Sequence, residues 1–326
     1  MRDQDNATAR ATIAPSGGLA AAALGVLAFS FTIPATAFAL RGFGSYTIGL
    51  GRAAVAAVLA VVALRLMRSP RPRGRQWPSL AVVAGGVVFG FPVLSTLALD
   101  HGASASHAAV VIGLLPVTTS VFAVVRVGER PSWLFWAASV AGAGCVVAFT
   151  LRNGPGRLSA ADLFLLGALV TAGLGYAEGG RLARNMPGGA VVSWALILAA
   201  PVTVPVTAVL LVAEPPRWSA QAVAGLAYLA AVSMFFGFFA WYSGLAKAGV
   251  ARASQVQLAQ PLLTLVWSWL LLGDHAGMST VTAAAGVLVC VMLAQRARVS
   301  RDMTASSAAR RTVSQGVVSR RGAADG

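Results

Sequence analysis

Long apolar runs, separated by short polar or charged segments, make up most of this chain. The hydrocarbon core of a bilayer is about 30 Å thick, so a helix needs about 20 mainly apolar residues to cross it. Within lipid the backbone must satisfy its own hydrogen bonds, which a helix does. The pattern therefore predicts an all-α membrane protein with ten transmembrane helices. The expected spans are residues 18–40, 48–66, 80–99, 106–125, 133–150, 162–183, 191–212, 222–245, 253–272 and 280–294.

The composition agrees with a membrane protein. Of the 326 residues, 57% are hydrophobic and 11% are charged, which is too apolar for a soluble domain of this size. The net charge is +15, but the basic residues stand between the apolar runs and are not interleaved with aromatic residues. We therefore expect the lipid bilayer as a partner and no nucleic acid.

The distribution of basic residues predicts the orientation of the chain. With the N-terminus inside, sixteen basic residues fall in cytoplasmic segments and four in the opposite loops. Under the positive-inside rule this bias predicts a multi-pass protein of the inner (plasma) membrane with both termini in the cytoplasm. Residues 1–17 are then an N-terminal cytoplasmic segment, and residues 296–326 a disordered basic tail.

The two halves of the chain repeat each other at an offset of 145 residues. Residues 116–129 can be laid over residues 261–274 without a gap, matching proline with proline and Gly-Glu with Gly-Asp, and the same offset places Cys145 on Cys290. This predicts two five-helix units, residues 18–150 and 151–295. Because five is odd, the second unit would enter the membrane inverted, an arrangement typical of alternating-access transporters. The alternative is that duplication only builds a larger helical bundle.

Several segments resemble the EamA-type branch of the drug/metabolite transporter superfamily. They are residues 103–109 leading to Pro116 and Gly128-Glu129, residues 173–182, and residues 240–246 followed by 249–261. The resemblance covers about residues 18–294. It implies ten helices around a central cavity and movement of small metabolites, often export of amino acids or related compounds. Asp274-His275 departs from the Gly-Glu that such proteins commonly carry, with little consequence expected in a loop.

Two charged residues lie inside the predicted spans. Glu178 is deep in the sixth run, where a carboxylate is costly and usually faces a cavity, a cation or a substrate. The alternative is an ordinary helix-end ion pair with Arg181. Arg52 lies within the second run, where it either counters a substrate carboxylate or extends to the membrane interface.

Glutamines and prolines mark the ninth run as a second source of polar groups. Gln255, Gln257 and Gln260 precede Pro261, and a proline frees backbone carbonyls that can face a cavity. A glutamine amide offers both a donor and an acceptor to an amino-acid-like substrate. The alternative role is hydrogen bonding between helices. We expect Pro34, Pro92, Pro116 and Pro261 to break their helices.

Aromatic residues complete the list of substrate-binding candidates. Tyr176 lies two residues before Glu178, and Phe31 lies in the counterpart stretch of the first run, which has no acid. Trp241 and Tyr242 belong to an aromatic run that lines a cavity or else packs against lipid as an interfacial belt.

No feature of the sequence points to a cofactor. No histidine pair has metal-ligand spacing, and no phosphate loop, GxSxG or HExxH motif occurs. We therefore expect a secondary transporter of a small molecule, a monomer or homodimer, and not an enzyme. The alternatives are a membrane-embedded enzyme, which requires a catalytic cluster that the apolar runs lack, and a lipid or drug flippase.

Overall fold

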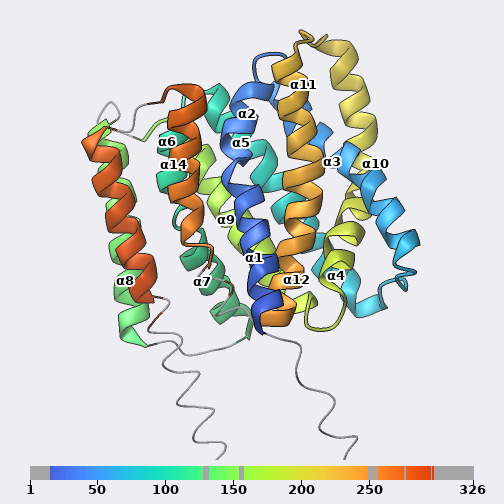
Figure 1. The fold of residues 1–326 in the computed structure, drawn as a ribbon, viewed down its shortest axis with the longest axis horizontal. Helices are drawn as coiled ribbons and strands as arrows, with labels where there is room; N and C mark the ends of the chain where they lie inside the picture. The colour runs from blue at the N-terminus through green and yellow to red at the C-terminus, as the bar shows by residue number, and fades with distance from the viewer. Residues whose placement is uncertain are drawn as a thin grey trace, which may run out of the picture.

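The protein folds into a bundle of helices that run between two ends of the molecule (Figure 1). The computed structural model describes residues 15–127, 132–153, 158–248, 253, 256–274, 277–294 and 296, and this part of the chain contains no strand. Gln255 and Glu129, two residues singled out in the sequence, lie outside the described residues. The fold class predicted from the apolar runs, an all-α membrane protein, is confirmed.

Within the described residues, eight helical segments are long and apolar enough to cross a membrane. Two shorter apolar helices, Ala259–Leu272 and Met278–Ala294, follow them. The eight segments are Gly17–Ala39, Ser45–Leu66, Gly74–Asp100, Ala105–Val125, Trp133–Arg152, Ala160–Leu182, Gly188–Ala213 and Ala220–Ala248. Each begins within a few residues of a predicted span, because the apolar length that lipid demands is visible in the sequence.

Several of these segments consist of more than one helical element. In the first half the elements are α1 (Pro15–Ser30), α2 (Thr32–Ala39), α3 (Ser45–Leu66), η2 (Gly74–Gln76), α4 (Trp77–Val83), η3 (Ala84–Gly90), α5 (Phe91–Asp100), α6 (Ala105–Ile112), α7 (Leu115–Val127) and α8 (Trp133–Asn153). In the second half they are α9 (Ala160–Leu182), α10 (Gly188–Ala213), α11 (Ala220–Ala227), η4 (Tyr228–Gly237), α12 (Phe238–Ala248) and α14 (Ala259–Leu272).

The four prolines expected to break helices all lie at or near element boundaries. Pro34 follows the turn between α1 and α2, and Pro116 follows the turn between α6 and α7. Pro92 is the second residue of α5, where a π-helix changes to an α-helix. Pro261 lies in the first turn of α14. A proline lacks the N–H that would bond to the carbonyl four residues earlier, which favours a boundary at these positions. A proline alone does not end a helix, because Pro201 and Pro205 lie inside the continuous helix α10.

Glycines let some of these helices approach closely. A Cβ built on Gly86 would lie 2.5 Å from the carbonyl oxygen of Thr171 and 2.9 Å from the Cα of Gly175, both on α9. Only a residue without a side chain fits this crossing between η3 and α9. Gly90 meets Thr171 in the same way one turn later.

The helix Met278–Ala294 lies beside α8 at one edge of the bundle (Figure 1). A Cβ on Gly142 would lie 3.2 Å from the Cβ of Cys290, and one on Gly286 would lie 3.4 Å from the Sγ of Cys145. The thiols of Cys145 and Cys290 also interact with each other. These two helices therefore pack through their two cysteines, which the 145-residue offset makes equivalent, and through nearby glycines.

Candidate functional site

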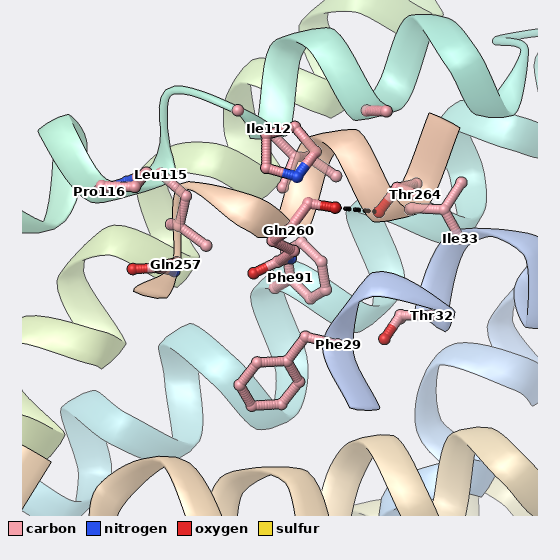
Figure 2. A pocket seen from close by; sticks show the side chains of 13 residues that line it. Phe29, Thr32, Ile33, Phe91, Ile112, Leu115, Pro116, Gln257, Gln260 and Thr264 are labelled. Atoms are coloured by element: carbon pink, nitrogen blue, oxygen red, sulfur yellow. Dashed lines mark hydrogen bonds between the residues drawn. The ribbon is translucent and has the colours of Figure 1, made fainter. Parts of the chain in front are cut away.

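A small pocket lies at the centre of the bundle, where several helix breaks meet (Figure 2). Its volume is about 10 Å³, which is room for about one water molecule. The lining residues come from α1, α2, α5, α6, α7, α14 and the turns that precede α7 and α14. They are Phe29, Thr32, Ile33, Phe91, Ala109, Ile112, Gly113, Leu115, Pro116, Gln257, Gln260, Pro261 and Thr264.

Broken helices give this pocket its polar groups. Pro34 cannot bond to the carbonyl of Ser30 four residues earlier, and that carbonyl instead accepts a hydrogen bond from Thr264 Oγ1 at 2.8 Å. The indole of Trp267 donates to Ser30 Oγ at 3.0 Å. The break between α1 and α2 is thus stabilised by α14, a helix more than 200 positions away in the sequence.

Two glutamines from the start of α14 have amide groups without partners. Gln257 is 2% exposed and Gln260 is 8% exposed. The Nε2 donor of Gln257 and the Oε1 acceptor of Gln260 make no hydrogen bond within the described part of the chain. A buried amide group without a partner is costly. The pocket therefore contains a donor and an acceptor that a small polar ligand can satisfy.

An aromatic cluster closes the pocket toward the end of the bundle at which α1 begins and α12 ends, the lower end in Figure 1. Phe29 lines the pocket and also contacts Phe238, Tyr176 and Trp241, with ring centroids 4.7, 6.0 and 6.4 Å away. Tyr242 stacks on Phe238 and donates to the carbonyl of Gly175 at 3.3 Å. The structure thus brings the predicted candidates Tyr176, Trp241 and Tyr242 together, one layer below the pocket.

Phe31 lies elsewhere. Its ring packs edge-on against Tyr228 and Trp267, with centroids 4.8 and 6.0 Å away, and it does not line the pocket. In this segment it is Phe29, two positions earlier, that lines the pocket. Two positions turn a helix by about 200°, so neighbouring aromatic residues face opposite sides.

Glu178 is paired at the lower end of the bundle. Its carboxylate is 1% exposed and accepts hydrogen bonds from Nε and Nη2 of Arg181, whose side chain is 50% exposed. The same Nη2 donates to Ser79 Oγ of α4 at 2.7 Å. This geometry agrees with the alternative interpretation of the sequence, an ion pair between Glu178 and Arg181 near the end of the helix. The bond from Arg181 to Ser79 joins α9 to the first half of the chain.

We expect Glu178→Gln to weaken the fold and to leave transport by the folded molecules within about twofold of the unmodified protein. The change removes charge-assisted bonds worth about 1.5–3 kcal/mol, and the half-exposed Arg181 can turn to water. The melting temperature and substrate exchange, each per amount of folded protein, check this. Abolished exchange at an unchanged melting temperature would instead mean that the carboxylate takes part in transport.

The side chain of Arg52 is 1% exposed and lies within α3. Its Nε and Nη1 have no hydrogen-bond partner among the described residues.

A second, polar pocket of about 520 Å³ lies at the opposite, upper end. Here Nε2 of His107 is 2.9 Å from Oδ1 of Asp162, which is within ion-pair distance. The geometry of this contact does not meet the criteria for a hydrogen bond. The N–H of Ser106 donates to Oδ2 of Asp274 at 2.9 Å. Both contacts join the first half of the chain to the second. Asp162 was not predicted as a functional residue from the sequence, where its signal is the capping box that it forms with Ser159.

No group of three or more His, Cys, Asp or Glu side chains suitable for a metal ion occurs in the described ranges. The chemistry of the central pocket is therefore that of amides, hydroxyls, free carbonyls and aromatic rings.

Both halves of the chain match a known protein family. Residues 16–151 and again residues 159–295 match the EamA-like transporter family. The chain belongs to the EamA-like transporter family. This protein is therefore a multi-pass membrane transporter, and the family match covers both halves of the internal repeat.

Two relatives of this EamA-like transporter carry transporter names. The chain is 43% identical to "Uncharacterized transporter YdeK" of Bacillus subtilis (strain 168), across 84% of this chain and 95% of that protein. It is 25% identical to "Probable terminal-alkyne amino-acid exporter" of Streptantibioticus cattleyicolor, across 88% and 96%. A solved structure matches with a TM-score of 0.61 at 18% identity, covering 86% of this chain and 96% of that one, and supports the fold.

Proposed function

We propose that this EamA-like transporter is a secondary transporter that exports an amino acid or a related small metabolite across the inner membrane. The central pocket is its binding site, and alternating access is its mechanism. The observation that carries the proposal is the convergence of four helix breaks on one buried pocket with unpartnered amides (Figure 2). Broken helices at the middle of a bundle supply polar backbone where a substrate needs it.

The chemistry of the pocket favours an amphipathic substrate. Gln257 and Gln260 offer a donor and an acceptor, while Phe29, Phe91 and Ile112 offer apolar surface. An amino acid has groups for both. The name of the Streptantibioticus cattleyicolor relative, a terminal-alkyne amino-acid exporter, agrees with this class and with export. Because the pocket has room for about one water, it must widen to admit any such molecule.

We further propose ten membrane spans in two inverted repeats, with both termini in the cytoplasm. Three features recur at an offset of about 145: the prolines Pro116 and Pro261, the π-helices η3 and η4, and the two cysteines. Residues related by a twofold axis contact each other only near that axis. The interaction between Cys145 and Cys290 supports an axis that passes near α8 and the Met278–Ala294 helix.

A thiol cross-linking experiment tests this packing. In a functional protein a short bifunctional thiol reagent should join Cys145 to Cys290 within one chain, since their thiols interact and no other cysteine competes. Cleavage between the halves at an engineered protease site near residue 156 should then leave the two fragments joined. Cys145→Ser is the matched control. Complete separation of the fragments after reaction of both thiols would contradict the packing.

Alternating access requires that contacts between the halves break at one end at a time. At the upper end these contacts include those of His107 with Asp162, Ser106 with Asp274 and the N–H of Arg217 with the carbonyl of Gly42. At the lower end they are the aromatic cluster around Phe29 and the bond from Arg181 to Ser79. We propose the upper end as the outer gate and the lower end as the cytoplasmic gate.

Counterflow into proteoliposomes tests the function directly. Liposomes containing purified protein and loaded with one unlabelled amino acid should accumulate the same labelled amino acid, while protein-free liposomes should not. The panel should contain the protein amino acids and L-propargylglycine, a terminal-alkyne amino acid. Net flux without counterflow would favour a channel, lipid movement without amino-acid exchange a flippase, and chemical conversion of a compound an enzyme.

A further inference from the structure

Arg52 is the one arginine of α3 that is enclosed by protein, since Arg65 at the end of the same helix is exposed. It is 1% exposed, and two of its three guanidinium nitrogens have no partner in the described part of the chain. A buried charge normally has an opposite charge beside it, because desolvation without compensation is costly. Arg52 therefore needs an explanation beyond packing.

The carboxylates that the structure describes within the bundle are engaged elsewhere. Glu178 pairs with Arg181, and Asp162 with His107. Asp274 accepts from the N–H of Ser106. The ion pairs found among the described residues therefore do not include Arg52.

Helix register places Arg52 at the level of the central pocket. Ile48, one turn earlier on α3, belongs to the same apolar cluster as Leu229 of η4. Gly49, three residues earlier, packs against Val93 of α5. Residues three and four positions apart share a helix face, so Arg52 projects between η4 and α5.

On η4, which runs parallel to α3 in Figure 1, one turn beyond Leu229 is Ser233. The hydroxyl of Ser233 is hydrogen-bonded to that of Thr32 at 2.8 Å, and Thr32 lines the pocket. The segment that contains α5 runs in the opposite direction to α3. A step from Gly49 to Arg52 on α3 therefore corresponds to a step back from Val93 to Gly90, and Gly90 is next to Phe91, which lines the pocket. Arg52 is not among the residues that line the pocket, but these two neighbouring helices place it at the level of the pocket-lining residues Thr32 and Phe91.

We infer that Arg52 binds the carboxylate of the transported substrate, so that this transporter selects compounds with an anionic group. The guanidinium of arginine is always charged and its planar donors match a carboxylate. The substrate supplies the missing anion once the pocket widens, and its remaining polar group meets Gln257 and Gln260. This inference rests on the proposed transport function and deepens it, because it names the group that the site recognises.

A matched series of probes tests the inference on the purified full-length protein. L-Leucine, L-leucinamide and isoamylamine share one side chain, but only L-leucine has a carboxylate. For any other amino acid that binds, the corresponding acid, amide and decarboxylated amine are compared in the same way. Binding is measured by thermal shift and by competition. We expect the acid to bind at least about tenfold more tightly than its amide or amine.

Substitutions at Arg52 should remove this preference. We expect Arg52→Gln to weaken binding of the acid by about 100-fold and to change amide binding less than about twofold. Arg52→Lys should be intermediate, because it keeps the charge and loses the planar fork. Arg65→Gln, on the same helix but exposed, should behave like the unmodified protein. Without ligand, Arg52→Gln should melt at or above the unmodified protein, because a buried unpaired charge is removed.

Three results would overturn the inference. They are equal binding of acid and amide, unchanged acid binding by Arg52→Gln, and a large fall in the ligand-free melting temperature of both Arg52→Gln and Arg52→Met, which would make Arg52 structural. If the protein exchanges only uncharged or cationic compounds, the inferred selection of a carboxylate is wrong, whereas the proposed transport function still holds. Arg52-dependent binding of acids without any exchange in liposomes would instead reject the proposed transport function.

Discussion

Gly86→Ala should lower the melting temperature of the purified protein by several degrees, while Gly85→Ala should leave it unchanged or raise it. A Cβ on Gly86 meets the backbone of α9 at 2.5 and 2.9 Å, and neither the carbonyl of Thr171 nor the Cα of Gly175 can move without shifting the helix. Overpacking of this kind costs about 1–3 kcal/mol. A Cβ on Gly85 meets nothing within 4 Å.

The two glycines form a matched pair because they are neighbours in the same π-helix. Helix propensity favours alanine at both positions by about 1 kcal/mol, so any difference between the variants comes from the contact with α9. Gly175→Ala, on the other side of the crossing, should behave like Gly86→Ala, since its Cβ would lie 2.6 Å from Cγ1 of Val87. Equal melting temperatures for the variants at positions 85 and 86 would show that these helices do not cross here.

Replacing Gln260 by leucine should reduce the transport rate at low substrate concentration by about 10–100-fold, and Gln257→Leu should have a similar effect. Each change removes a buried amide atom that has no partner among the described residues and that we assign to the substrate, Nε2 of Gln257 or Oε1 of Gln260. A lost hydrogen bond to a charged substrate group is worth about 1.5–3 kcal/mol, which is the size of this effect. Initial rates of counterflow, divided by the amount of folded protein, measure it.

Gln221→Leu is the control for these variants. Gln221 also carries an amide, but it accepts from Arg41 at the upper end of the bundle, away from the central pocket. Transport by this variant should stay within about twofold of the unmodified protein. Because leucine is close in size to glutamine and apolar, the pocket variants should remain folded or become more stable. Full transport by both Gln257→Leu and Gln260→Leu would reject the central pocket as the binding site.

The spans and the breaks could be predicted because each depends on residues close together in the sequence. A membrane span is a length of apolar residues, and a proline disrupts the bond to the fourth residue before it. For the same reason the repeat was visible, since Pro116 and Pro261 stand at equivalent positions in the two halves. The exact elements were less visible: the π-helices η3 and η4 have no proline or charge inside them.

The members of the candidate site were predicted only in part. Gln257 and Gln260 line the pocket, whereas Phe31 faces Tyr228, and Phe29 occupies the position facing the pocket. Thr32 and Thr264, which were not singled out, line it as well. Threonines inside apolar runs were the available signal, but such residues more often bond to their own helix, as Thr264 also does with Gln260.

The sequence by itself thus determined the helical membrane class, the break positions, the repeat and the family. Only the tertiary structure decided which residues face each other, such as Thr264 and Ser30, Asp274 and Ser106, or Phe29 and Phe238. The physical reason is that lipid and the protein interior are both apolar. A helix that is hydrophobic on all sides carries no periodic pattern to show which face turns inward, so its rotation is fixed only by packing against distant helices.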